Sequence, residues 1–151
     1  MIQKSKVCAA IPVPQKGVDL EEWSVRESLK FLELLGYQKV IIKTDQEEAL
    51  NAVIRKLRLY RGSDTQTMQE HNPVGSSQSN GATERRIQTI EGQIRTLRSA
   101  FESRTGSKLP ANCPLFAWLV VHAGSIITLF ETGRDGRVPF QRLRGRKCLQ
   151  R

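Results

Sequence analysis

A run of β-branched residues between two stretches with helical patterns is the feature that most limits how this chain can fold. Lys39 to Thr44 contains the sequence Val40-Ile41-Ile42, and a short continuous apolar run is typical of a strand buried on both faces. The stretches on either side, Asp19 to Leu35 and Gln46 to Leu59, repeat apolar residues at helical spacing. A strand between two helices favours an α/β layer with parallel strand pairing.

Caps and turn-forming residues predict the neighbouring elements. The first helix is predicted to start at Asp19, a suitable N-cap residue, and to stop at Gly36. Lys6 to Val13 is apolar and is followed by a turn sequence, which predicts another strand. Thr65 to Met68 has the composition of a short strand.

The second half of the chain is predicted to be helical. The loop from His71 to Gly81 is rich in Pro, Gly, Ser and Asn, which indicates irregular structure. A long amphipathic helix is then predicted from Ala82 to Arg104, and an apolar helix from Pro114 to Phe130 that is ended by Gly133. Five apolar residues of the long helix fall on one stripe: Ile87, Ile90, Ile94, Leu97 and Phe101.

The net charge of +9 belongs to one half of the chain. Up to Glu84 there are 11 Lys and Arg residues against 11 Asp and Glu residues, and from Arg85 onward there are 13 against 4. Such an asymmetry favours a polyanion as partner, and nucleic acid more than membrane, because no basic amphipathic helix with an aromatic face is evident. A solvated basic face is the alternative.

The cysteines and the apolar runs exclude several classes of protein. Three widely spaced cysteines and two histidines predict neither a disulfide framework nor a zinc finger. The run from Leu115 to Phe130 is interrupted by polar residues and is shorter than the ~20 residues of a membrane span. We therefore expect a soluble intracellular protein in which this run is a buried helix.

Two acids stand at positions suited to a metal site. Asp45 follows the predicted strand, and Glu84 lies in the first turn of the long helix, on a face beside its apolar stripe. Taken alone, Asp45 is better explained as a helix cap with Glu48 in a capping box, and Glu84 as an exposed helix residue. Their order along the chain, with a helix and a polar loop between them, raises the hypothesis that both bind a divalent cation.

Several motifs extend this hypothesis. In the centre of the chain they are Lys43-Thr44-Asp45, the loop from Pro73 to Gly81 with its Gln78-Ser79-Asn80-Gly81, and Glu84. In the C-terminal part they are Trp118, Gly133-Arg134-Asp135-Gly136, Pro139-Phe140 and Gly145-Arg146-Lys147. Together they resemble the catalytic core of integrases from retroviruses and long-terminal-repeat retrotransposons.

The resemblance implies a ribonuclease H-like fold, with a three-layer mixed sheet and flanking helices, and DNA integration by strand transfer. It implies that Asp45 and Glu84 are catalytic and that, with a third carboxylate, they hold two Mg²⁺ or Mn²⁺ ions. Gln78 and Asn80 would border the DNA. Candidates for phosphate contacts, which position nucleic acid without reading its sequence, are Arg85, Arg95 and Arg98.

The family's first catalytic Asp has no match in this chain. Only one predicted strand and one predicted helix precede Asp45, so the ribonuclease H-like sheet is expected to lack its first strand and most of its second. We therefore expect a fragment: a partial core in residues 1–133 and a basic C-terminal tail in residues 134–151. On its own it is expected to be incompletely folded and inactive, because two carboxylates leave a metal pair under-ligated. The family further implies DNA as partner, a homo-oligomer and a nuclear location.

Two other interpretations stay open beside the integrase core. One is a non-catalytic nucleic-acid-binding remnant that keeps the basic helix and tail. The other is an unrelated, mostly helical basic binding module in which Asp45 is only a cap. Whether the chain is an enzyme is therefore open at this stage.

Overall fold

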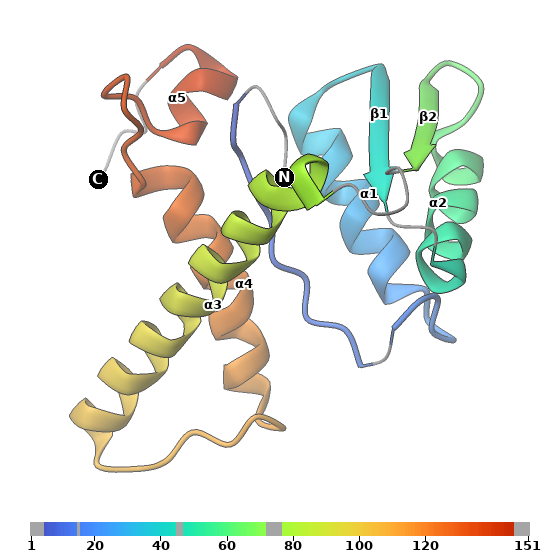
Figure 1. Cartoon of the computed structure of the whole chain (residues 1–151). Helices are drawn as coiled ribbons and strands as arrows, with labels where there is room; N and C mark the ends of the chain where they lie inside the picture. Colours follow the sequence, from blue (N-terminus) through green and yellow to red (C-terminus); the bar gives the residue numbers. More distant parts are fainter. Residues whose placement is uncertain (1–4, 15, 45–46, 72–76, 147–151) are drawn as a thin grey trace. The chain divides into compact units, whose positions relative to one another are not determined.

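The computed structural model describes residues 5–14, 16–44, 47–71 and 77–146, and for residues 77–80 it describes only the backbone (Figure 1). The chain packs as two compact units. The sheet unit comprises Val13–Gly81, and the helical unit comprises Met1–Pro12 together with Ala82–Arg151.

The sheet unit alternates helices and strands. It contains α1 (Trp23–Leu35), β1 (Lys39–Thr44), α2 (Glu48–Arg61) and β2 (Gln66–His71). The two strands pair in parallel, and the crossover between them, which parallel pairing requires, is α2. The predicted α/β class and the first of these strands are thus confirmed, and β2 continues three residues beyond the predicted strand.

The two-stranded sheet is covered on one face. Alternate residues of β1 are half-buried, and Gln69 of β2 donates from its Nε2 to Asn51 Oδ1 of α2 at 2.7 Å, so this face is turned toward α2. On the other face Ile41 is 52% exposed and its partner in the register, Met68, is 44% exposed. The prediction that β1 is buried on both faces is therefore wrong for these described residues, because the packed helix covers only one side.

The core of the sheet unit lies between α1 and α2. Val25 and Leu35 of α1 and Ile54 and Leu57 of α2 are buried, as the helical spacing of apolar residues predicts. Burial of such side chains is the main favourable contribution to the stability of this unit.

The start of α1 differs from the prediction. The helix begins at Trp23, four residues after Asp19, because Glu22 takes a left-handed conformation with φ of 54° that interrupts the helix on its N-terminal side. Glu22 takes the predicted N-cap position of Asp19, but the Asp19 Oδ1 still accepts a hydrogen bond from the first N–H of the helix, that of Trp23, at 2.8 Å. The predicted stop at Gly36 is confirmed, and its φ of 73° is the conformation that glycine adopts at the end of a helix.

Glu22 also joins the two helices of the sheet unit. Its carboxylate accepts hydrogen bonds from the Lys56 ammonium group and, at 2.5 Å, from the Tyr60 hydroxyl, both on α2. Both hydrogen bonds hold the pKa of Glu22 below its usual value, and the one from Lys56 has the larger effect. The same hydrogen bonds raise the pKa of Lys56 and of Tyr60.

The helical unit contains most of α3 (Ser77–Thr105), together with α4 (Pro114–Phe130) and α5 (Pro139–Arg144). The predicted bounds of α4 are confirmed. Helix α3 starts five residues earlier than predicted, so the expected irregular loop is helical from Ser77 onward, where no proline interrupts the backbone hydrogen bonds. Helix α5 lies in the segment predicted as a basic tail. No helix within the described residues is long and apolar enough to cross a membrane.

The segment predicted as an N-terminal strand is not a strand in its described residues. Residues 5–12 run along α4, where the Cys8 N–H donates to Thr128 Oγ1 at 3.2 Å and the Thr128 hydroxyl donates to the Cys8 carbonyl at 3.0 Å. A Cβ atom on Gly124 would lie 2.9 Å from the Ala10 nitrogen. The Thr128 side chain and the close approach of the Ala10 backbone to Gly124 therefore hold this segment, in place of the expected pairing with another strand.

Candidate nucleic-acid interface

The acid predicted at the end of the first strand, Asp45, lies outside the described residues. Strand β1 ends at Thr44, and the N-cap position of α2 belongs to Glu47. The Glu48 side chain pairs with Arg55 at 2.5 Å. The interpretation of Asp45 as the N-cap residue in a capping box is therefore wrong, because α2 begins two residues later than predicted. Its role as a metal ligand stays a prediction.

The other predicted ligand, Glu84, lies on α3 and is exposed. No group of three or more His, Cys, Asp or Glu side chains among the described residues is arranged to hold a metal ion. Because Mg²⁺ and related ions require several converging oxygen ligands, these described residues by themselves do not fit the predicted metal pair. No catalytic step can be derived from them.

The predicted DNA-bordering residues Gln78 and Asn80 lie in the first turn of α3. Their backbone is helical, so they do not belong to an irregular loop as the composition predicts. Their contact with DNA stays a prediction.

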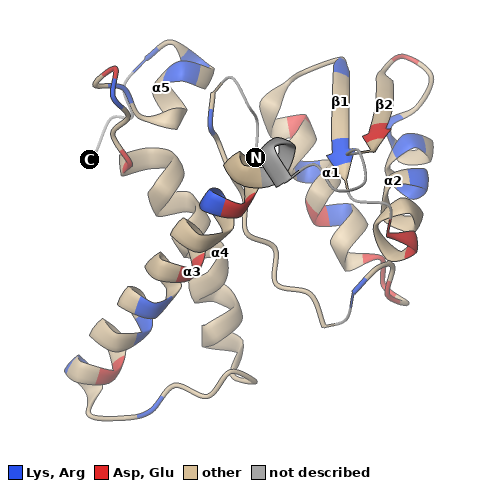
Figure 2. Cartoon of the chain, in the orientation of Figure 1, with Lys and Arg blue, Asp and Glu red and all other residues tan. Residues whose placement is uncertain are grey.

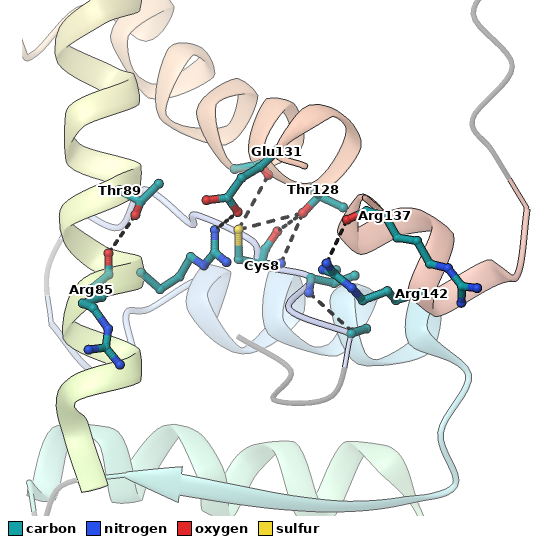
Figure 3. A network of polar contacts seen from close by, with 11 residues as sticks. Cys8, Arg85, Thr89, Thr128, Glu131, Arg137 and Arg142 are labelled. Atoms are coloured by element: carbon teal, nitrogen blue, oxygen red, sulfur yellow. Dashed lines mark hydrogen bonds and ion pairs between the residues drawn. The ribbon is translucent and has the colours of Figure 1, made fainter. Parts of the chain in front are cut away.

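The three candidate arginines of α3 differ in how accessible they are. Arg85 is exposed, and its backbone carbonyl accepts a hydrogen bond from the Thr89 hydroxyl at 2.8 Å (Figure 3). Arg95 is 72% exposed and lies 3.8 Å from Glu91. Both can therefore reach a phosphate group.

Arg98 is held within the helical unit. Its Nε donates to Glu102 Oε1 at 3.0 Å, and its guanidinium group lies 5.8 Å from the centroid of the Phe116 ring on α4. A cation that already has a carboxylate and an aromatic partner is less available to DNA. The structure thus separates Arg98 from the other two candidates.

Glu102 is the centre of a contact that the sequence analysis missed. Its carboxylate accepts hydrogen bonds from the Leu109 N–H at 2.9 Å, from Arg98 at 3.0 Å and from Lys108 at 3.5 Å. The backbone hydrogen bond from Leu109, followed by that from Arg98, holds the pKa of Glu102 below its usual value. This carboxylate therefore fixes the connection between α3 and α4. The four-residue spacing of Arg98 and Glu102 in the sequence could have predicted the contact between these two residues.

A second missed contact joins α3 to the end of α4. Arg86 forms an ion pair with Glu131, and the Arg86 side chain is only 11% exposed. The two residues are far apart in the sequence, so no local pattern could have paired them. Arg86 is consequently a structural residue and not part of an exposed basic face.

The third missed contact organises the residues before α5. Arg142 donates from Nε to Asp135 Oδ2 at 3.0 Å. It also donates from Nη2 to the Arg137 carbonyl at 2.8 Å (Figure 3). The hydrogen bond from Arg142 is the main reason why the pKa of Asp135 lies well below its usual range. A Cβ atom at position 133 would lie 2.0 Å from Arg142 Nη2, so this packing requires Gly133.

The charged residues are distributed unevenly over the helical unit. Figure 2 shows acidic and basic residues interspersed along α3, whereas basic residues predominate on and around α5. The part of the molecule best suited to a polyanion is therefore the helical unit, in which some arginines are neutralised internally and others are exposed.

No protein-family model matches the chain, and no curated protein sequence matches it.

Proposed function

We propose that this chain is a piece of the catalytic core of a retroviral or retrotransposon integrase, with a ribonuclease H-like fold, and that its residues bind DNA. The observation that carries the proposal is the order of β1, α2 and β2, with parallel pairing of the strands, followed by a long helix that carries Glu84. The motifs around Asp45 and Glu84 occur in this order in the family that the sequence resembles.

The register of the sheet supports the assignment. Thr44 pairs with His71, so β1 and β2 end at the same edge. Asp45 follows one strand end, and the segment that leads to α3 follows the other. In α/β sheets, ligands bind outside the carboxyl ends of the parallel strands, and Asp45 follows directly after one of these two ends in the sequence.

The charge of the helical unit supports DNA as the partner. Arg85 and Arg95 are exposed on the helix that carries Glu84, and arginine contacts with phosphates would hold DNA in position near that acid. Of the three acidic positions of the family, only two have matches among these 151 residues. Strand transfer is accordingly proposed for a protein in which a third carboxylate completes the site, in the nucleus and as a multimer.

A non-catalytic nucleic-acid-binding protein is the second candidate. It is favoured by the exposed arginines of the helical unit, since DNA binding by arginine side chains needs no metal.

The metal dependence of DNA binding distinguishes these two functions. We would measure the affinity of the whole chain for duplex DNA by fluorescence anisotropy, with Mg²⁺ or with a chelator at matched ionic strength. If Glu84 is a metal ligand, Mg²⁺ strengthens binding and Glu84→Gln removes that gain. The matched control is Glu91→Gln, which removes the same charge from an exposed position of α3 and keeps the gain.

Two results would change the conclusion. If Mg²⁺ has no effect on the unaltered chain, the non-catalytic candidate replaces the first. If the unaltered chain does not bind duplex DNA, both candidates fail.

A further inference from the structure

The residues from Gly133 to Arg146, called here the arginine module, have a higher density of positive charge than α3. The module contains five arginines and one acid in 14 residues, whereas α3 contains five arginines and three acids in 29 residues. The arginines of the module are Arg134, Arg137, Arg142, Arg144 and Arg146. Charge density alone favours the module over α3 as a site for a polyanion.

Internal ion pairs increase this difference. On α3 the side chains of Arg86, Arg95 and Arg98 all have a carboxylate within ion-pair distance. In the module, Arg134 and Arg137 are exposed, and no described carboxylate forms an ion pair with either of them. Three of the five arginines of α3 therefore have an internal carboxylate partner, whereas Arg134 and Arg137 of the module have none among the described residues.

The backbone that carries these two arginines is already ordered. The Gly133 N–H donates to the Arg137 carbonyl at 3.0 Å, and the Gly136 N–H donates to the Gly133 carbonyl at 3.0 Å. Gly136 has a φ of 70°, a left-handed conformation that glycine adopts without strain. These hydrogen bonds close a tight turn with Arg134 inside it and Arg137 at its end.

Arg142 holds this turn from within. It binds the Asp135 carboxylate and the Arg137 carbonyl, while the Arg137 side chain extends away from the network (Figure 3). Asp135 is thereby neutralised by a partner other than the two exposed arginines. A turn that is fixed before binding loses less conformational entropy when it contacts a ligand.

The chemistry of the surface favours nucleic acid over a membrane. A membrane-surface segment needs apolar side chains that insert between lipids, and no described residue of the module is a large hydrophobic residue with an exposed side chain. Arginine binds phosphate groups through two parallel N–H donors. We propose that the arginine module, through Arg134 and Arg137, is a docking surface for the phosphate backbone of DNA. This inference rests on the proposed function, because it names where the chain contacts its DNA.

The test is the salt dependence of DNA binding by the double variant Arg134→Gln, Arg137→Gln. Affinity of the whole chain for a short random-sequence duplex is measured by fluorescence anisotropy over a series of KCl concentrations. Loss of two phosphate contacts is expected to make the slope of log K against log salt less steep by about 1.8, since each contact contributes about 0.9. At low salt we expect the affinity to fall about tenfold or more.

Matched variants separate a local contact from a general effect of net charge. The variant Arg26→Gln, Arg58→Gln removes two exposed positive charges from α1 and α2 of the sheet unit. It is expected to change the slope much less than the module variant does. The variant Arg134→Lys, Arg137→Lys keeps the charge and is expected to recover most of the affinity. Circular dichroism of each variant tests whether its helix content is preserved.

A third double variant, Arg85→Gln, Arg95→Gln, tests α3 directly. If it reduces the slope as much as the module variant or more, the DNA surface lies on α3 and the inference is overturned. An equal effect of the sheet-unit variant overturns it as well, because binding then follows net charge alone.

The remaining outcomes separate this inference from the proposed function. If the unaltered chain binds DNA and the module variant binds equally well, only the placement of the surface is wrong. If the unaltered chain binds phosphatidylserine vesicles but not DNA, the proposed function fails together with this inference. Binding to duplex DNA that weakens more in the module variant than in the α3 variant, and is unchanged in the sheet-unit variant, supports both.

Discussion

The two units of the molecule differ most in charge. The sheet unit has 9 Lys and Arg residues against 10 Asp and Glu residues, whereas the helical unit has 15 against 5. The net positive charge of the chain therefore belongs to the helical unit. From this difference we predict a division of roles: Asp45 follows β1 of the sheet unit in the sequence, whereas Glu84 and the exposed Arg85, Arg134 and Arg137 belong to the helical unit.

The two units are also stabilised in different ways. In the sheet unit, buried apolar residues lie between α1 and α2, and Glu22 adds a link through Lys56 and Tyr60. In the helical unit, carboxylates organise the ends of helices: Glu102 in the last turn of α3, and Asp135 before α5. Arg98 and Arg142, which these carboxylates bind, are therefore part of the architecture, whereas Arg85, Arg134 and Arg137 are exposed.

The largest expected effect is a core substitution in the sheet unit that leaves DNA binding unchanged. Leu57 is 4% exposed, and Leu57→Ala is expected to cost about 3 kcal/mol because it leaves a cavity. Thermal unfolding followed by circular dichroism measures the loss. The control is Leu59→Ala on the same helix, where the side chain is 75% exposed and the change is expected to be small.

DNA affinity of Leu57→Ala should equal that of the unaltered chain at temperatures where the variant is folded. A large loss of affinity under those conditions would show that the sheet unit contributes directly to binding, against the division of roles.

A smaller loss of stability is expected in the helical unit from Gly124→Ala. The added methyl group would lie 2.9 Å from the Ala10 nitrogen, so the N-terminal segment must move away from α4, at a cost of about 1 to 3 kcal/mol. Gly92→Ala on α3 is the control, because its nearest contact is the end of the Arg95 side chain at 3.9 Å. That substitution is expected to stabilise slightly by raising helix propensity. Equal unfolding temperatures for the two variants would contradict the close approach at Gly124.

Acid is expected to weaken the contacts of Glu102. The pKa of this carboxyl lies below the usual 4.5 in the folded chain, so its contribution to stability is complete above the unfolded pKa and is lost as the pH falls through the folded pKa. Unfolding temperatures measured over a pH series should therefore be constant near neutral pH and fall below about pH 4. Glu102→Gln should reduce that acid-dependent part. An unchanged pH profile in the variant would show that other carboxylates dominate it.

The smallest expected effect concerns an exposed pair on α3. Arg95 and Glu91 lie 3.8 Å apart with side chains 72% and 57% exposed, and such pairs contribute about 0 to 1 kcal/mol. Glu91→Gln should therefore leave the unfolding temperature nearly unchanged, while it modestly strengthens DNA binding by removing a negative charge. A marked destabilisation would mean that α3 depends on its surface ion pairs.

Local patterns predicted the elements whose residues interact mainly with sequence neighbours. The β-branched run became β1, the apolar run Pro114–Phe130 became α4, and Gly36 stops α1. The segment before Pro12 could not be predicted in this way, because its hydrogen bonds reach Thr128 on a helix 120 residues away. An apolar segment whose backbone hydrogen bonds are made by a side chain on a helix has the same composition as a strand, so its sequence predicts a strand.

In the candidate site, too, local patterns predict only the contacts between residues close in the sequence. Exposure of Arg85 and Arg95 agrees with the sequence expectation for phosphate contacts, and the engagement of Arg98 with Glu102 could have been anticipated from their spacing along a helix. The ion pair between Arg86 and Glu131 depends on how α4 packs, so only the structure reveals it. Charge counts therefore overestimate the number of available cations until the internal partners are known.

The reciprocal hydrogen bonds between Cys8 and Thr128 have a consequence for thiol chemistry. The Cys8 side chain is buried, and its Sγ lies 3.8 Å from the Gly124 carbonyl, whereas Cys113 is partly accessible. A thiol reagent can reach Cys8 only during openings in which the N-terminal segment leaves α4. The rate at which Cys8 is labelled, compared with the rate for Cys113, therefore measures how often the N-terminal segment detaches from α4.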